Sequence, residues 1–114
     1  MIRNATRGTV VADRERWART PGERMRGLLD SPELQAGEGL VISPCNSIHM
    51  FGMGFALDVL FVRKDGVVVR AIENIRPGRM TRIYFTAKHT IELPVGAIAA
   101  SQTEPGDQLS WDEP

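Results

Sequence analysis

The chain has a single cysteine, Cys45, among its 114 residues, so an intramolecular disulfide is excluded and stability must come from packing. No apolar run approaches the about 20 residues of a membrane-spanning helix, and the first residues lack the apolar core of a signal peptide. We therefore expect a soluble, cytoplasmic protein with no membrane partner. A mature exported chain without its leader would have the same features.

An excess of either charge is also absent, since 14 Lys and Arg residues balance 14 Asp and Glu residues. A chain with zero formal net charge has no global basic field that would draw it to nucleic acid, so no nucleic-acid partner is expected. Positive charge is instead local, and Arg76, Arg79 and Arg82 either pair with acidic segments or form an anion-receiving edge. The length predicts one domain over residues 1–114, because a chain of this size builds a single core.

The clearest local signal is a capping box that begins at Thr20 and ends at Glu23, with Pro21 at the first helical position. Apolar residues recur at helical spacing after this box, which gives the segment one buried face. The residue before Pro32 is disfavoured in a helix, so the helix must end there or earlier. These features predict one main helix over about residues 21–29.

Strand signals are more numerous. Residues 57–62 and 67–75 are rich in β-branched side chains and flank an Asp-Gly turn, which predicts a hairpin. Further short strands are expected at residues 8–12, with a charged continuation to 19, and at residues 39–43, 47–51, 90–94 and 108–111. A short helix is expected at residues 96–101. Many short strands around one main helix predict an α+β fold, in which a mostly antiparallel sheet curls into a small barrel-like domain.

Chemically distinct groups concentrate in residues 44–66. This stretch holds Cys45, His49, three of the four phenylalanines, and Asp58 within an apolar run. Gly52 and Gly54 interrupt it, and such glycines favour a bulge or a close approach of the backbone to another group. We therefore expect the functional site around residues 45–58.

The order and spacing of six fragments resemble one known family. The fragments are Glu23-Arg24-x-x-Gly27-Leu28-Leu29, Glu38 to Ile42, Ile48-His49-x-Phe51-x-Met53, Leu57-Asp58-Val59-x-Phe61, Ile91-Glu92-Leu93-Pro94-x-Gly96, and Gly106-Asp107. Over about residues 20–111 the chain resembles the domain-of-unknown-function family numbered 192, in the branch with a cysteine and an Ile-His pair. The resemblance implies a compact β-rich domain with one main helix and implies no activity. This branch commonly has an arginine after the methionine, where this chain has Gly54, so an anion-binding role for that arginine cannot be carried over.

The function that these features favour is binding. Phenylalanines and methionines beside two glycines are typical of an apolar groove in which a ligand approaches the backbone. We expect a small-ligand or peptide-binding accessory module with no cofactor and no metal, whose partner is an unidentified small molecule or protein. The expected ligand-binding residues are His49, Phe51, Met53, Gly54, Asp58, Arg79, Arg82 and His89.

Three alternatives stay open, and the sequence does not decide whether the protein is an enzyme. A small hydrolase or thiol enzyme would use Cys45, His49 and Asp58, but on a continuous strand the first two would lie ~13 Å apart. A metal site would combine both histidines with Cys45 and with Asp58 or Glu92, at a spacing that fits no compact zinc pattern. A structural interaction module would recruit a protein through an exposed sheet edge.

Asp58 and Glu92 each interrupt an apolar strand segment. Such a carboxylate either faces solvent or is buried, and a buried one needs an arginine or backbone amides as partners. Asp58 would stay ionised beside Arg79 or Arg82. In an apolar pocket its pKa would rise, and it could then act as an acid or a base.

Overall fold

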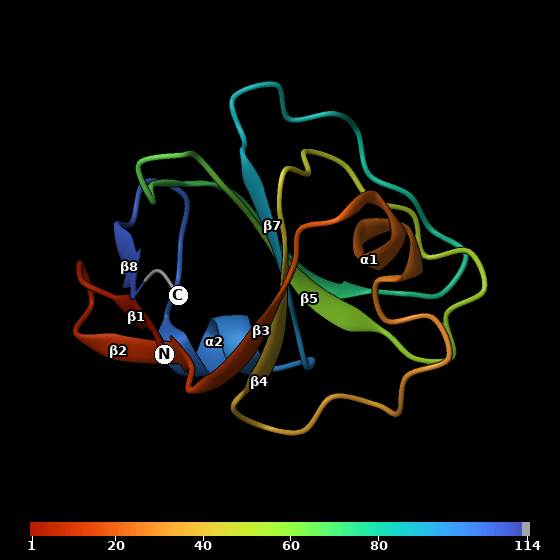
Figure 1. Ribbon diagram of the computed structural model, residues 1–114. Coiled ribbons are helices and arrows are strands. Elements are labelled where there is room, and N and C mark those ends of the chain that lie inside the picture. The colour runs from red at the N-terminus through yellow and green to blue at the C-terminus, as the bar shows by residue number, and fades with distance from the viewer. Residues whose placement is uncertain (113–114) are drawn as a thin grey trace.

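The computed structural model describes residues 1–112, and in this range it contains two β-sheets and two short helices (Figure 1). The larger sheet has the strand order β3-β4-β7-β5-β6, formed by Arg14–Ala18, Glu38–Ile42, His89–Leu93, Leu57–Val62 and Val68–Ile75. The smaller sheet has the order β2-β1-β8, formed by Thr9–Ala12, Ile2–Asn4 and Leu109–Trp111. Across residues 1–112, neither helix has the length and apolar content needed to cross a membrane.

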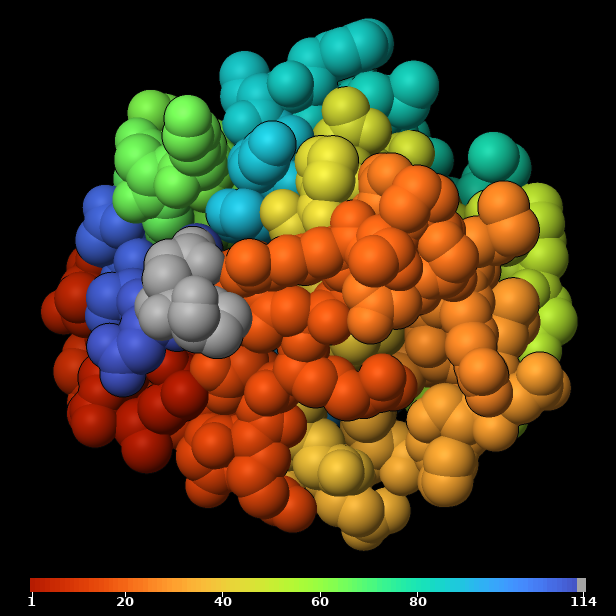
Figure 2. Space-filling view, in the orientation of Figure 1, coloured from red at the N-terminus to blue at the C-terminus, as the bar shows by residue number. Residues whose placement is uncertain are grey.

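The α+β fold is confirmed, and the barrel-like closure is wrong. Strands β3 and β6 are the two edge strands of the five-stranded sheet and do not pair with each other. Strand β1, which the sequence did not predict, pairs with β2 and β8 and builds a separate sheet. The beginning and end of the described chain therefore lie side by side, as the red and blue surfaces in Figure 2 show.

Pairing in the five-stranded sheet is antiparallel except between β3 and β4, which run parallel. A parallel connection requires a crossover, and the crossover here contains helix α1, Pro21–Arg26. The predicted capping box is present, because Glu23 N donates to Thr20 Oγ1 at 3.1 Å and Thr20 N donates to Glu23 Oε1 at 3.0 Å. The helix is shorter than predicted, since Gly27 at its end has a φ of 49°.

The predicted hairpin is confirmed as β5 and β6, and the short helix near residue 96 is confirmed as α2, Ala97–Ser101. The predicted strand over residues 47–51 is wrong, because that segment forms only an isolated bridge between His49 and Met80. It hydrogen-bonds instead to an irregular loop, with Thr81 N donating to Ile48 O at 2.9 Å and Tyr84 N donating to Asn46 O at 2.9 Å. A turn at Gly52, where φ is 79°, ends this pairing.

Both faces of the five-stranded sheet are buried at its inner strands β5 and β7. One face, here called the α2 face, packs against α2 and the small sheet through a cluster that includes Leu60, Leu93 and Ile98. The other, here called the α1 face, packs against α1 and the loops through a cluster that includes Val59 and Leu28. Sheets covered on both sides have nearly continuous apolar strands, which is the pattern of β5 and β7.

Alternation along the strands places the two strand carboxylates on opposite faces. Asp58 lies opposite Leu93 and points to the α2 face, whereas Glu92 lies opposite Val59 and points to the α1 face. Asp58 is fully buried, and its side chain accepts hydrogen bonds from the backbone amides of Asn74, Gly96 and Ile98 at 2.9–3.0 Å. Its partners are therefore backbone amides and not Arg79 or Arg82, and they connect β5 to β6 and to the start of α2.

Removing the Asp58 carboxylate should destabilise the whole fold. We expect Asp58→Ala to lower the free energy of unfolding by about 3 kcal/mol or more, because three buried N–H donors would lose their acceptor at about 1–3 kcal/mol each. Urea denaturation measures the change. The matched control is Glu73→Ala at an exposed position on β6, which should stay within about 0.5 kcal/mol of the parent. Equal stabilities for the two variants would contradict this role.

Candidate functional site

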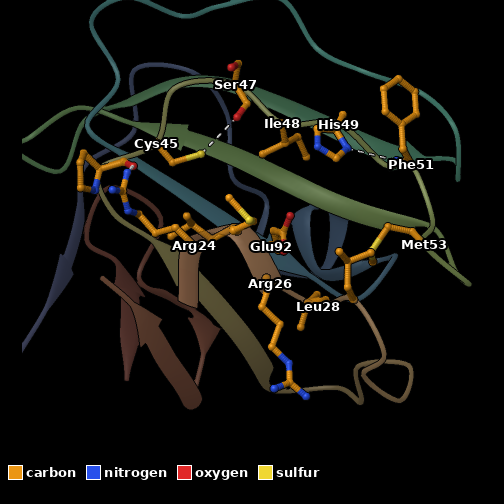
Figure 3. Close-up of a pocket in the computed structure, with 15 residues that line it drawn as sticks. Arg24, Arg26, Leu28, Cys45, Ser47, Ile48, His49, Phe51, Met53 and Glu92 are labelled. Atoms are coloured by element: carbon orange, nitrogen blue, oxygen red, sulfur yellow. Dashed lines mark hydrogen bonds between the residues drawn. The ribbon is translucent and has the colours of Figure 1, made fainter. Parts of the chain in front are cut away.

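A cavity of about 220 Å³ lies on the α1 face, between helix α1 with the residues that follow it and the segment 44–53 (Figure 3). We call it the α1 cavity. Its apolar lining includes Leu28, Ile42, Ile48 and Met53. Its polar lining consists of Arg24, Arg26, Cys45, Ser47, His49 and Glu92.

Glu92 reaches the α1 cavity from β7, in the middle of the sheet. Figure 3 shows its carboxylate among the other lining side chains, between Arg26 and Leu28 on one side and Ile48 and His49 on the other. The residue is only 6% exposed, and its Oε1 has no hydrogen-bond partner within residues 1–112. Burial raises the pKa of Glu92 to about 7 from an ordinary value of 4.5. Glu92 therefore changes charge near neutral pH.

Arg24 enters the same cavity from α1. One end of its guanidinium is held in place, because Nη1 donates to the carbonyl oxygen of Pro44 at 3.1 Å. Its Nε is buried and has no hydrogen-bond partner in the described chain. Nearly all buried polar atoms in proteins have partners. Here Arg24 Nε and Glu92 Oε1 are the buried side-chain atoms without one among residues 1–112, and both residues line the α1 cavity.

Two other polar residues of the cavity, Cys45 and His49, already have local partners. The Cys45 thiol donates to the carbonyl oxygen of Ser47 at 3.2 Å. His49 is exposed, its Nδ1 accepts a hydrogen bond from Phe51 N at 3.4 Å, and its ring stacks on the Phe51 ring with centroids 4.8 Å apart. Phe51 and Met25 stay largely exposed beside the opening, at 52% and 84%. They give the cavity an apolar rim.

The residues of the site predicted from the sequence do not all lie together in the structure. His49, Phe51 and Met53 line the α1 cavity, whereas Gly54 lies outside its lining. Arg79 and Arg82 line a different groove of about 490 Å³, beside the outer strand β6, together with Arg76 and Tyr84. We call this the arginine groove. The predicted arginine rim therefore does not border the α1 cavity.

Two further predicted residues lie on the opposite face of the sheet. Asp58 is held by three backbone amides under α2. His89 is buried, and its Nδ1 lies 2.7 Å from the Ser43 hydroxyl. Its ring contacts Trp17 and Trp111 edge-on, with centroids 5.6 Å and 5.3 Å away. The structure brings neither residue to the α1 cavity.

The positions of these residues can be compared with the two chemical alternatives, a thiol enzyme and a metal site. No hydrogen bond between residues 1–112 joins Cys45 to His49 or to Asp58, and the sheet separates Asp58 from the other two. In the same range no three His, Cys, Asp or Glu side chains gather as a metal site would require. The geometry therefore gives a thiol triad and a shared metal centre no support within this part of the chain.

Sequence reasoning gave too little weight to Arg24 and Glu92. Arg24 lies in a basic stretch that is typical of a solvated helix face. Glu92 was considered as one option for a metal ligand and as a strand carboxylate that either faces solvent or is buried, but not as part of the predicted binding site. The available signal was the position of Glu92 within an apolar strand that is buried on both faces. Because both faces of such a strand are covered, a carboxylate on it is buried whichever face it points to.

The charge of Glu92 makes stability depend on pH. Between pH 4.5 and about 7 the folded chain keeps a proton that the unfolded chain has released, so the free energy of unfolding falls as pH rises. The loss across this interval is about 3 kcal/mol, and Glu92→Gln should not show it. Urea denaturation of both proteins at several pH values tests this, since all other titratable groups are shared. Parallel profiles for the two proteins would contradict the assignment.

Comparison with known proteins identifies the family. The model of DUF192, described as an uncharacterized ACR, matches residues 2–111. UPF0127 proteins of Thermococcus sibiricus and Thermococcus gammatolerans are each 34% identical, over 98% of this chain and 75% of their own length. A solved structure of a protein of unknown function from Novosphingobium aromaticivorans is 26% identical, with a TM-score of 0.76 over 85% of this chain and 74% of that one. The resemblance carried by the six fragments is confirmed, and the chain belongs to the DUF192 family.

Proposed function

We propose that the protein is a binding module and that the α1 cavity holds its ligand. One observation carries the proposal: both buried side-chain atoms that lack a partner within residues 1–112 belong to residues of this one cavity. An unpartnered buried polar group costs about 1–3 kcal/mol. A ligand that supplies the missing partners recovers part of this free energy on binding.

The size of the cavity limits the bound group. A single water needs about 10–15 Å³ of such space, so about 220 Å³ accommodates a ligand of several heavy atoms. Pockets for drug-sized ligands run from about 300 to 1,000 Å³. The α1 cavity therefore fits a compact molecule or the end of one side chain of a larger partner.

The lining offers both apolar and polar contact. Leu28, Ile42 and Ile48 surround the space with apolar surface, and Glu92 supplies a polar group at its inner wall. At the rim of the cavity, the exposed parts of Met25 and Phe51 offer further apolar surface to any part of a ligand that extends beyond it. This arrangement supports a small molecule or a short peptide segment as the ligand class.

Methyl NMR tests where small molecules bind. We expect compact fragments of up to about eight heavy atoms to shift the methyl signals of Ile42, Ile48 and Met53, which line the cavity. The signals of Met1 and Met80, outside that lining, should stay unchanged. Affinities in the millimolar range are expected, because few atoms make contact.

A pair of variants tests the part played by Glu92. Glu92→Leu removes the polar group and fills part of the space, so it should abolish the fragment-induced shifts. Glu73→Leu makes the same change at an exposed site away from the cavity and should preserve them. Saturable binding that shifts only methyls elsewhere, or that survives in Glu92→Leu, would overturn the proposed site.

A further inference from the structure

We propose that the arginine groove is a docking site for an acidic segment of a partner protein, in which apolar side chains alternate with carboxylates. The groove shares no lining residue with the α1 cavity, so this site does not depend on the ligand of that cavity. Two features support the docking site: positive charge that has no partner within residues 1–112, and exposed apolar side chains beside it.

The arginines of the groove are not paired within the described chain. Arg76, Arg79 and Arg82 are exposed, and among residues 1–112 their side chains make no hydrogen bond or ion pair. Arg7, by contrast, pairs with Asp107 at 3.0 Å. Pairing with acidic segments was one of two options that the sequence left open, and it is absent from this range. The other option, an anion-receiving edge, matches the structure.

The charge of the lining favours an anionic ligand. Glu73 is the acidic residue of the lining, and against three arginines it leaves two positive charges in excess. Like charges that face one groove repel each other, and an anion between them removes this repulsion. The planar guanidinium binds carboxylates and phosphates through two parallel hydrogen bonds. Carboxylates on a peptide therefore suit this lining.

The groove follows the edge of the sheet and not one of its faces. Its lining includes the four consecutive residues 72–75 of the edge strand β6. Successive side chains of a strand point to opposite faces, so a space that borders all four runs along the strand edge. Three rises of ~3.3 Å give this stretch a length of up to about 10 Å. That length matches about three residues of extended peptide and exceeds a single phosphate or carboxylate group.

The partner should bind through side chains and not as an added strand. Asn74 has a φ of 54°, and its N–H donates to Asp58 Oδ1 at 2.9 Å. Such an irregularity interrupts the backbone of an edge strand and protects the edge against strand addition. Recognition therefore depends on the arginines and on apolar contacts.

Apolar side chains are exposed beside the arginines. Met80 lines the groove and is 69% exposed, and Ile72 and Tyr84 are half-buried in the same lining. Phe85, the next residue in the chain, is 83% exposed. Arginine, methionine and aromatic residues are enriched in protein–protein interfaces. A compact polyanion would leave this apolar surface in water, whereas a peptide with apolar side chains covers it.

The loop that carries the arginines is held in place by the core. Gly78 N donates to Met50 O at 2.9 Å, and Met50 N donates to Arg79 O at 2.6 Å. Met50 is fully buried, so these hydrogen bonds fix the loop to the interior. A loop that is already ordered loses little backbone freedom on binding, which favours affinity.

Three peptides that differ in charge or in apolar content test the proposal. The first is Ac-Asp-Leu-Asp-Leu-Asp-NH2; the second has Asn in place of each Asp, and the third has Ser in place of each Leu. In methyl NMR titrations at low salt, the first peptide should shift the signals of Ile72 and Met80, which line the groove. We expect it to bind at least about ten-fold more tightly than either of the others, and less tightly as salt is raised. The Ile42 signal reports on the α1 cavity separately.

Charge variants test the arginine contacts. Arg76→Gln, Arg79→Gln and Arg82→Gln should each weaken binding of the acidic peptide about two- to five-fold, the effect of one exposed ion pair. Glu73→Gln removes the negative charge of the lining and should tighten binding by a similar factor. Arg3→Gln is the matched control, since it makes the same change of charge at an exposed position on β1 and should leave the affinity unchanged.

Four results would overturn the proposal. Citrate or pyrophosphate binding as tightly as the acidic peptide would show a site for a small polyanion. Tighter binding of single-stranded oligothymidylate would show a nucleic-acid interface. Equal losses in Arg3→Gln and Arg79→Gln would show that net charge alone attracts the peptide. If the Ile72 and Met80 signals do not move, the peptide does not occupy the groove.

Discussion

Burial of the inner strands β5 and β7 on both faces of the sheet is the constraint on which the rest of the structure depends. It forces every side chain of β5 and β7 into an apolar environment, including two carboxylates. The α2 face is covered by the small sheet and α2, and the α1 face by α1 and the long loops that connect the strands. Because neither face is open, no side chain on the central strands can reach bulk water directly. Each polar group there must find a partner in the protein, in ordered water or in a ligand.

The two carboxylates meet this requirement in opposite ways. Asp58 receives three backbone amide hydrogen bonds and thereby connects β5 to β6 and α2. Glu92 lies one register position away on the neighbouring strand, its side-chain Oε1 has no hydrogen-bond partner within residues 1–112, and the residue lines a cavity. A buried group with all its partners is typical of a structural role. A buried group that lacks them, beside an empty volume, is the kind of feature that ligand recognition uses.

Local chemistry made part of this fold predictable. The capping box at Thr20, the Asp-Gly hairpin and the short helix after Gly96 depend on residues near each other in the chain, and all three are present. The parallel pairing of β3 with β4 and the strand β1 depend on partners distant in sequence, which no local pattern specifies. In the candidate site, too, residues close together in the chain were predictable and residues distant in sequence were not. His49, Phe51 and Met53 were found in one segment, whereas Arg24 and Glu92 come from distant parts of the chain and meet only when the fold forms.

The most direct test of the account is the ionisation of Glu92 itself. A ¹³C NMR titration of the glutamate side-chain carboxyl carbons, with Glu92 assigned by its absence in Glu92→Gln, measures its pKa in the folded protein. The account gives a midpoint at about 7, because burial disfavours the charged form and no partner within residues 1–112 offsets it. A midpoint near the ordinary 4.5 would show that the carboxylate is solvated or paired. The α1 cavity would then have no unmet carboxylate for a ligand to satisfy.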